Sequence, residues 1–237
     1  MATESHGHYA WGVSIDVEVE AGVAVVPVRG RLQPFERLRS ALQATYDNGE
    51  ASVVLLNLWP GADVPGFEGD AVRWLWRDYP LPAVCAFTGE LAGTALNVAL
   101  GADVRVCDTD ASMRFGDDWD DLTAQRLRRL LQLAPAAVPP TRTVMGHREL
   151  LDRGLVSSVV DRGRGLAEAR RLARVIASRG PIATKLAKEA IWRGLEMPLE
   201  QALRFETDLT LLLQTTKDRA EGVRAFLEKR QPHFIGE

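Results

Sequence analysis

The stretch that decides the fold reads "TGELAGTALNVALGADVRV" (residues 88–106). An apolar run over residues 82–88 leads into it and predicts a buried strand. A turn containing glycine follows, then an apolar helix, and "DVRVC" (103–107) predicts the next strand. A helix that starts directly after a buried strand leaves free backbone N–H groups there, and such groups can hold an anion.

The same alternation of strand and helix extends toward the N-terminus. Ala21-Gly22 separates two β-rich runs, which together predict a hairpin. Strands alternating with helices are typical of an α/β core. The expected elements are strands at 14–20, 23–28 and 52–58 and helices at 33–49 and 69–79.

Beyond about Leu122 the pattern changes to consecutive helices, preceded by a short strand at 157–160. The expected division is an α/β core over residues 1–179 and a helical region for oligomerisation over 180–237. Helices are expected at 168–178, 183–195, 199–214 and 218–230. The last helices have an apolar face, which includes Leu203, Phe205, Leu209, Leu212 and Leu213.

Composition excludes several classes of protein. The chain has 237 residues, 46% of them hydrophobic, and a net charge of −3 without a basic stripe, so nucleic acid is not an expected partner. No apolar run is long enough to span a membrane, and the first residues do not resemble a signal peptide, so a cytoplasmic protein is expected. Cys85 and Cys107 lie in apolar strands and are expected to be buried free thiols. His6 and His8 lack partner ligands, so no metal is expected.

Two turns leave buried strands at comparable points. "PGADV" (60–64) follows the strand at 52–58, and "LAGTALN" (91–97) follows the strand at 82–88. If the two turns lie side by side, each can supply one N–H group to an oxyanion hole. Taken alone, each is also compatible with an ordinary tight turn.

The order and spacing of these motifs resemble the enoyl-CoA hydratase/isomerase (crotonase) superfamily. "GADV" stands where that family has its Gly-Ala-Asp-Ile/Leu turn, and residues 88–106 align without gaps on its glycine-rich segment. The resemblance extends over "GLVSSVV" (154–160), "KEAI" (188–191) and "TKDRAEGVRAFLEKRQPHFIG" (216–236). Relative to the family, the chain is shorter between Val64 and Leu81 and between Asp117 and Gln125.

The resemblance implies a crotonase-like spiral of ββα units with a C-terminal helical trimerisation region. It implies an acyl-CoA thioester as ligand, coenzyme A as part of the substrate and no other cofactor, and a homotrimer or a hexamer of two trimers. By position, the backbone N–H groups of Ala62 and Thr94 form the oxyanion hole, although Thr94 replaces a family glycine. Substrate contacts fall on Asp63, Val64, Gly93, Phe226 and Lys229, the last two across a subunit interface. Lys229 is equally compatible with a solvated helix charge.

The catalytic acids of the family are altered. Asn97 occupies the position of the first catalytic glutamate; its amide can orient a water or a carbonyl but cannot exchange a proton. A gapless alignment places Asp117 on the second glutamate, whereas aligning Phe115-Gly116 with the family's Phe-Gly places Trp119 there. We prefer the gapless alignment because it keeps the strand length from Asp103. The acids at 117–121 are also typical of an exposed helix N-terminus.

Three functions therefore remain open at this point. The first is an enzyme that stabilises an enolate of an acyl-CoA with a single acid/base carboxylate, which suits a double-bond isomerase better than a hydratase. The second is a non-catalytic acyl-CoA-binding protein or partner subunit. The third is a structural trimer without CoA. The sequence does not identify the acyl group or the pathway.

Overall fold

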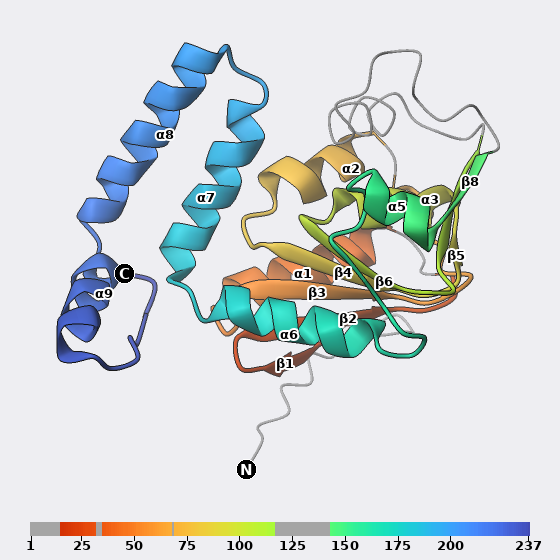
Figure 1. Ribbon diagram of the computed structural model, residues 1–237, viewed down its shortest axis with the longest axis horizontal. Coiled ribbons are helices and arrows are strands. Elements are labelled where there is room, and N and C mark those ends of the chain that lie inside the picture. The colour runs from red at the N-terminus through yellow and green to blue at the C-terminus, as the bar shows by residue number, and fades with distance from the viewer. Residues whose placement is uncertain (1–14, 32–34, 68, 117–142) are drawn as a thin grey trace.

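A computed structural model describes residues 15–31, 35–67, 69–116 and 143–237 (Figure 1). In this part of the chain, one sheet has the strand order β1-β2-β3-β4-β6-β9. β1 pairs antiparallel with β2, as the hairpin prediction required, and the other neighbours are parallel. The strands are β1 (Glu18–Glu20), β2 (Val23–Val28), β3 (Val53–Leu58), β4 (Ala83–Phe87), β6 (Val104–Asp108) and β9 (Ser158–Val160).

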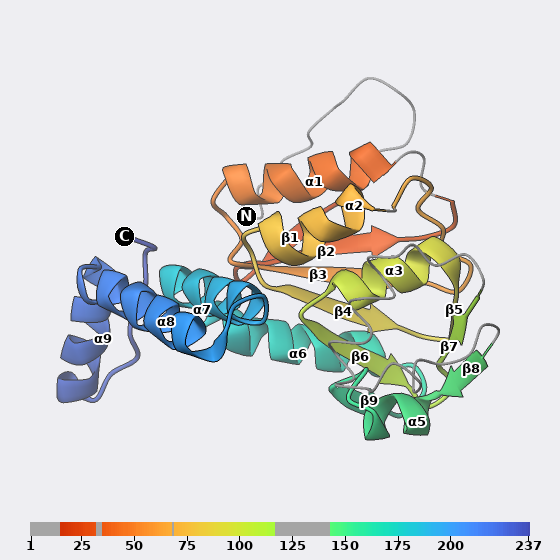
Figure 2. The ribbon, with the colours of Figure 1, turned by 90° about the horizontal axis from the view of Figure 1, so that it is seen from above.

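Helices cover both faces of this sheet (Figures 1 and 2). One face packs against α1 (Phe35–Asp47), α2 (Asp70–Arg73) and α3 (Gly93–Gly101), and the other against α6 (Gly165–Ala177). The parallel strands are therefore buried on both sides, which explains why their sequences are continuous apolar runs. α2 continues directly into a π-helical turn, η1 (Trp74–Asp78).

A second, smaller sheet contains β5 (Glu90–Leu91), β7 (Ser112–Phe115) and β8 (Thr143–Gly146). β7 pairs parallel with β5 and antiparallel with β8. The expectation that only helices and the strand at 157–160 follow Leu122 is wrong at β8, and also omits the short helix α5 (His147–Asp152). β8 is four residues long and buries only Met145 fully, so its sequence has too little periodicity to predict a strand.

The end of β6 is fitted closely to the start of α6. The Asp108 side chain is buried, and its Oδ2 accepts a hydrogen bond of 2.7 Å from the N–H of Gly163. Its Oδ1 has no hydrogen-bond partner among the described residues and lies where a Cβ at residue 165 would stand. Gly165 is therefore required by the close approach of a carboxylate.

α7 (Pro181–Gly194), α8 (Leu199–Gln214) and α9 (Lys217–Glu228) extend away from the sheets (Figure 1). The expected boundary at 179/180 falls in the connection between α6 and α7, and the division into two regions stays a prediction. α7 is joined to the core through Asp103. Its carboxylate pairs with Lys188 at 2.9 Å and accepts a hydrogen bond of 3.0 Å from the indole of Trp192.

Candidate functional site

The two turns selected from the sequence lie side by side. β3 and β4 are parallel neighbours, with Leu58 opposite Phe87 at their carboxyl ends. The turn over residues 61–64 follows β3, and the start of α3 follows β4 through β5. The carboxyl edge of parallel strands is where α/β proteins bind ligands.

Within the 61–64 turn, the N–H groups of Ala62 and Asp63 are already engaged. Ala62 donates to the carbonyl of Trp59 at 3.0 Å, and Asp63 donates to the carbonyl of Gly30 at 2.9 Å. Gly61, at φ 75°, has the conformation that a type II turn requires at its third residue, and the Ala62 bond closes that turn. The assignment of the Ala62 N–H to an oxyanion hole stays a prediction, and it requires this N–H to be shared with the ligand.

The start of α3 offers a free donor. Ala92 is extended, Gly93 has φ 54°, and the first bond toward the helix end is a long one, from the N–H of Leu96 to the carbonyl of Ala92 at 3.4 Å. None of the described residues accepts a hydrogen bond from the N–H of Thr94. Thr94 is half-buried and lies in the first turn of α3, and a helix N-terminus favours negative charge.

The side chain of Thr94 connects the two turns. Its hydroxyl donates to Oδ1 of Asp63 at 2.6 Å and accepts from the N–H of Val64 at 2.8 Å. Oδ2 of Asp63 in turn pairs with the Arg31 guanidinium at 3.4 Å. The structure thus brings Asp63, Val64 and Thr94 together, and their assignment as ligand contacts stays a prediction.

Asn97 is buried beneath the same turns, with 5% of its surface exposed. Its Nδ2 donates to the carbonyl of Phe67 at 3.4 Å, and the Phe67 ring packs edge-on against Phe35. The amide therefore ties α3 to the segment before α2. Asp117 and Trp119, the alternatives for the second acid, lie outside the described residues.

The sequence reading missed two arginines at the same edge. Arg29 and Arg31 follow β2, and the guanidinium of Arg29 lies 4.3 Å from the ring centroid of Trp59, directly after β3. They are distant from the 61–64 turn in sequence, but the parallel pairing of β2 with β3 brings them beside it. In the sequence, their position directly after a predicted buried strand could have placed both arginines at this edge of the sheet.

Comparison with known proteins identifies the family. Residues 64–237 match the family model described as enoyl-CoA hydratase/isomerase. This chain belongs to the enoyl-CoA hydratase/isomerase family, in the crotonase superfamily.

Two named relatives have clear sequence similarity to this chain. The chain is 33% identical over 229 residues to the Arabidopsis thaliana protein named "Probable enoyl-CoA hydratase 2, mitochondrial", covering 85% of this chain and 75% of that one. It is 34% identical over 175 residues to the (E)-benzylidenesuccinyl-CoA hydratase of Thauera aromatica, covering 68% of this chain and 64% of that one. The chain thus spans just under two thirds of the length of the second relative.

The fold is that of solved members of the family. A crystal structure of an enoyl-CoA hydratase from Bacillus anthracis superposes with a TM-score of 0.78 at 26% sequence identity, covering 93% of this chain and 99% of that one. The predicted crotonase fold is confirmed.

The two cysteines of this family member are buried free thiols, as predicted. Burial raises the pKa of each thiol to about 12, so neither is a nucleophile at neutral pH. Within the described ranges, no group of three or more His, Cys, Asp or Glu side chains is arranged to hold a metal ion. The same ranges contain no helix that is long and apolar enough to cross a membrane.

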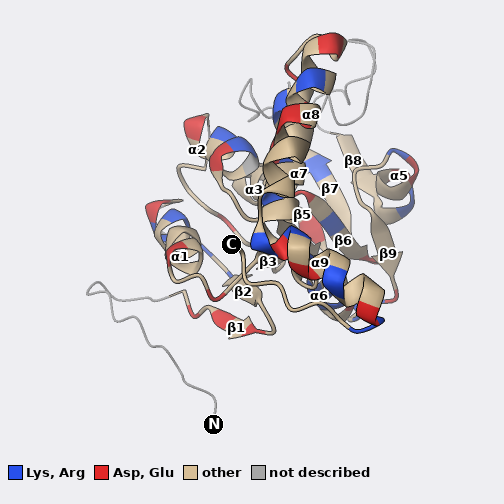
Figure 3. Cartoon of the chain, turned by 90° about the vertical axis from the view of Figure 1, so that its left-hand side faces the viewer, with Lys and Arg blue, Asp and Glu red and all other residues tan. Residues whose placement is uncertain are grey.

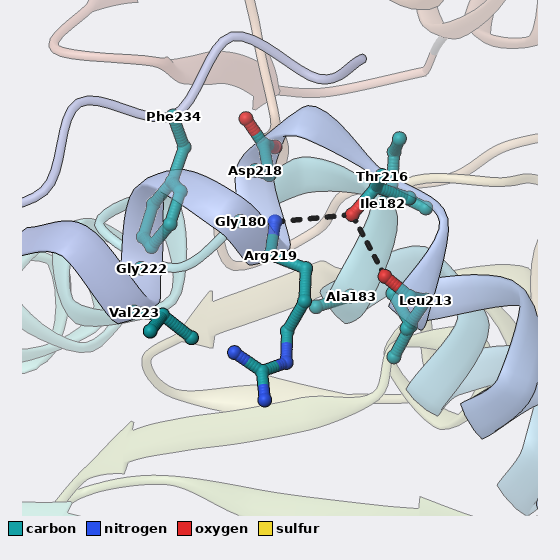
Figure 4. Close-up of a pocket in the computed structure, with 10 residues that line it drawn as sticks. All are labelled: Gly180, Ile182, Ala183, Leu213, Thr216, Asp218, Arg219, Gly222, Val223 and Phe234. Carbon is teal, nitrogen blue, oxygen red and sulfur yellow. Dashed lines mark hydrogen bonds between the residues drawn. The ribbon is translucent and has the colours of Figure 1, made fainter.

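A cavity of about 210 Å³ lies at the other end of the molecule, among α7, α8, α9 and the C-terminal tail (Figure 4). Its polar groups serve the fold. The Asp218 carboxylate accepts from the N–H groups of Ile235 and Gly236, and the Thr216 hydroxyl accepts from the N–H of Arg219 at the start of α9. We therefore place the candidate site at the sheet edge rather than in this apolar cavity.

Phe226 and Lys229 lie at the end of α9, and Phe226 is 82% exposed. In Figures 1 and 2, α9 and α3 lie on opposite sides of the molecule. Within one chain these two residues are therefore remote from the candidate site.

Proposed function

We propose that this family member binds an acyl-CoA thioester between the 61–64 turn and the start of α3. There it stabilises the negative charge that develops on the thioester oxygen when an enolate forms. The observation that carries the proposal is the N–H of Thr94, which has no acceptor among the described residues and stands at a helix N-terminus beside the second turn. Ala62 supplies the second donor by sharing the N–H that now reaches Trp59. A donor of this kind typically contributes about 2.7–4 kcal/mol to transition-state stabilisation.

The proposed proton chemistry uses one carboxylate. Asp117 moves the proton, and Asn97 contributes no acid because an amide does not exchange protons at neutral pH. Double-bond migration takes a proton from one carbon of the acyl group, which forms the enolate, and returns it to another carbon, so one acid/base group can serve both transfers, whereas adding water in the family manner uses two. We therefore favour isomerisation over hydration, although the relatives named above are hydratases.

The charge at the sheet edge supports an anionic ligand. The side chain of Arg31 is 66% exposed, and Arg29 lies over the neighbouring Trp59. Coenzyme A carries several phosphate charges, and guanidinium groups bind phosphate well. The two arginines flank the 61–64 turn, where the nucleotide part of such a ligand can reach them.

We further propose that the protein assembles as a trimer, or as two stacked trimers, through its C-terminal helices. Leu199 on α8 is 75% exposed, and Leu227 on α9 is 73% exposed. The chain has no charged residue from 209 to 216, a stretch that covers the end of α8 and the turn after it, and Figure 3 shows this part of the ribbon without charge colours. Since Phe226 is remote from α3 in its own chain, it can contact the ligand only of a neighbouring copy. Light scattering that finds a monomer at micromolar concentration contradicts this assembly.

A non-catalytic acyl-CoA-binding protein is the second candidate, because two observations favour it. The Ala62 N–H is engaged by Trp59, and the Asn97 amide is engaged by Phe67. Both groups stand where the family performs chemistry, and both serve the fold of this chain instead.

The experiment combines binding with turnover. Calorimetry with butyryl-CoA tests the ligand class, and a panel of enoyl-CoA thioesters tests for double-bond migration and hydration. The Asp117→Asn variant is compared with Asp118→Asn, which makes the same change one residue away. Turnover that is lost only in Asp117→Asn, with binding retained, supports the enzyme. Binding without turnover in any form supports the non-catalytic protein, and no binding of any CoA compound refutes both.

A further inference from the structure

The Thr94 side chain is a departure from the family pattern that the proposed chemistry does not use. By the resemblance described above, glycine is expected at this position, whereas here a hydroxyl bridges two segments 30 residues apart. We infer that Thr94 is a positioning residue, whose side chain sets the 61–64 turn at a fixed place relative to the N–H groups of α3 and thereby determines how well a thioester carbonyl is recognised.

The bridge leaves the hydroxyl no freedom. A threonine hydroxyl has one proton, which it donates to Asp63 at 2.6 Å, and an oxygen lone pair that accepts the N–H of Val64 at 2.8 Å. The bond to a carboxylate is charge-assisted, so it is stronger than a bond between neutral groups. The branched side chain also restricts rotation about χ1. Both bonds together therefore fix the turn in direction as well as in distance.

A third segment takes part in this connection. The Asp63 carboxylate forms an ion pair with Arg31, and the Asp63 N–H donates to the carbonyl of Gly30, so the segment after β2 is also connected to Asp63. The hydroxyl of Thr94 is thus the point at which the edges of β2 and β3 are joined to α3. Without it, the N–H of Val64 and Oδ1 of Asp63 have no hydrogen-bond partner among the described residues.

This arrangement bears directly on the proposed site. The backbone N–H of Thr94, which has no acceptor in the described part of the chain, is the proposed first donor, and the Thr94 side chain holds the turn that carries Ala62, the proposed second donor. The inference rests on the proposed acyl-CoA function for its ligand, but not for its hydrogen bonds. Coenzyme A lacks the whole butyryl group, so the two compounds separate recognition of the acyl group, which carries the thioester carbonyl, from recognition of the rest of the ligand.

The test measures dissociation constants of butyryl-CoA and of coenzyme A for the wild type and four variants. Thr94→Val removes the hydroxyl at constant shape, and Thr94→Ser keeps it. Thr88→Val is the matched control, because Thr88 also donates to a carboxylate, that of Asp110 at 3.0 Å, at the adjacent turn. Asp63→Ala removes the carboxylate that accepts from Thr94, at a partly exposed position, and replaces Thr94→Val in the test if that variant does not fold.

We expect Thr94→Val to reduce the preference for butyryl-CoA over coenzyme A by about tenfold, which corresponds to ~1.4 kcal/mol. Asp63→Ala should act in the same direction, and Thr94→Ser and Thr88→Val should keep the wild-type preference. A folded Thr94→Val protein that keeps the full preference overturns the inference, as does an equal loss in Thr88→Val.

A second measurement separates this inference from the proposed function. If the wild type binds neither compound, the acyl-CoA proposal fails, and amide hydrogen exchange then decides the role of Thr94 in placing the turn. Faster exchange at Val64 in Thr94→Val, but not in Thr94→Ser or Thr88→Val, supports it. Unchanged exchange at Val64 in Thr94→Val overturns it.

Discussion

Replacing Asn97 with aspartate changes one donor into an acceptor at almost constant shape. In the wild type the Asn97 amide is 5% exposed and donates to the carbonyl of Phe67. In Asn97→Asp a carboxylate oxygen faces that carbonyl instead, so a hydrogen bond is lost and two acceptors are left facing each other in a buried place. We therefore expect Asn97→Asp to be less stable than the wild type at neutral pH.

The magnitude follows from the burial and the lost bond. A buried group left without its partner costs about 1–3 kcal/mol, and more when it is charged, so we expect a loss of about 2–3 kcal/mol at pH 7. The observed bond of 3.4 Å is long, which argues against a larger value. For a domain of this size, each kcal/mol lowers the midpoint of thermal unfolding by about 2–4 °C, so the expected decrease is about 4–12 °C.

The pH dependence gives the sharper signature. Burial and the facing carbonyl both disfavour the charged form, so the pKa of the introduced carboxyl is raised in the folded state. The protonated form can donate to Phe67 as the amide does. The variant should therefore approach wild-type stability below the pKa of an unfolded aspartate, about 3.9, and lose stability as the pH rises through the raised folded value.

The assay is thermal unfolding of wild type and Asn97→Asp from pH 4 to pH 8, with Asn48→Asp at an exposed position as the control. The control should follow the wild type within about 0.5 kcal/mol at every pH. A variant as stable as the wild type at pH 8, or one whose deficit is the same at pH 4 and pH 8, refutes the reasoning about this hydrogen bond.

Three further predictions concern the rest of the chain. Lys188→Met should cost about 3 kcal/mol because it removes one member of the buried pair with Asp103, and denaturant unfolding measures this; a loss below 1 kcal/mol contradicts it. Hydrogen bonds from the Arg230 side chain and the His233 N–H lower the pKa of Glu221 to about 2, so its contribution to stability is present above the unfolded pKa and is lost as the pH falls from about 4.5 toward 2. The difference in thermal midpoint between wild type and Glu221→Gln should therefore shrink over that range, and a constant difference excludes this linkage. Both cysteines should resist a thiol reagent at pH 8 in the native protein and react once it is unfolded, because burial raises the pKa of each to about 12; rapid native labelling contradicts this.

The main sheet was predictable because its strands carry their own signal. β3 and β4 are continuous apolar runs, and runs buried on both faces have that composition wherever they occur. β5 and β8 have two and four residues, and they are strands only because β7 pairs with each of them. Such pairing depends on distant chain segments, so no local pattern predicts it.

The sequence could indicate which residues lie in the candidate site, but not most of the hydrogen bonds between them. The turns that contain Asp63 and Thr94 could be selected because each follows a predicted buried strand, and the parallel pairing of β3 with β4 then brings them to one edge. The hydroxyl bridge depends on the side-chain rotamer of Thr94 and on the register of two turns, and neither is encoded locally. The bond from Ala62 to Trp59 is different, because Pro60-Gly61 predicts a type II turn and hence that bond, so this signal was available in the sequence.

The fit between Asp108 and Gly165 constrains how this chain can change over generations. Any residue other than glycine at 165 brings a methyl or larger group onto the Asp108 carboxylate, so a substitution there is harmful while the aspartate remains. Replacing Asp108 alone with a small residue removes the obstacle but leaves the N–H of Gly163 without its acceptor. The substitutions that are tolerated at either position therefore depend on the residue at the other. A library randomised at both codons should return folded proteins in matched combinations, with aspartate at 108 found only beside glycine at 165.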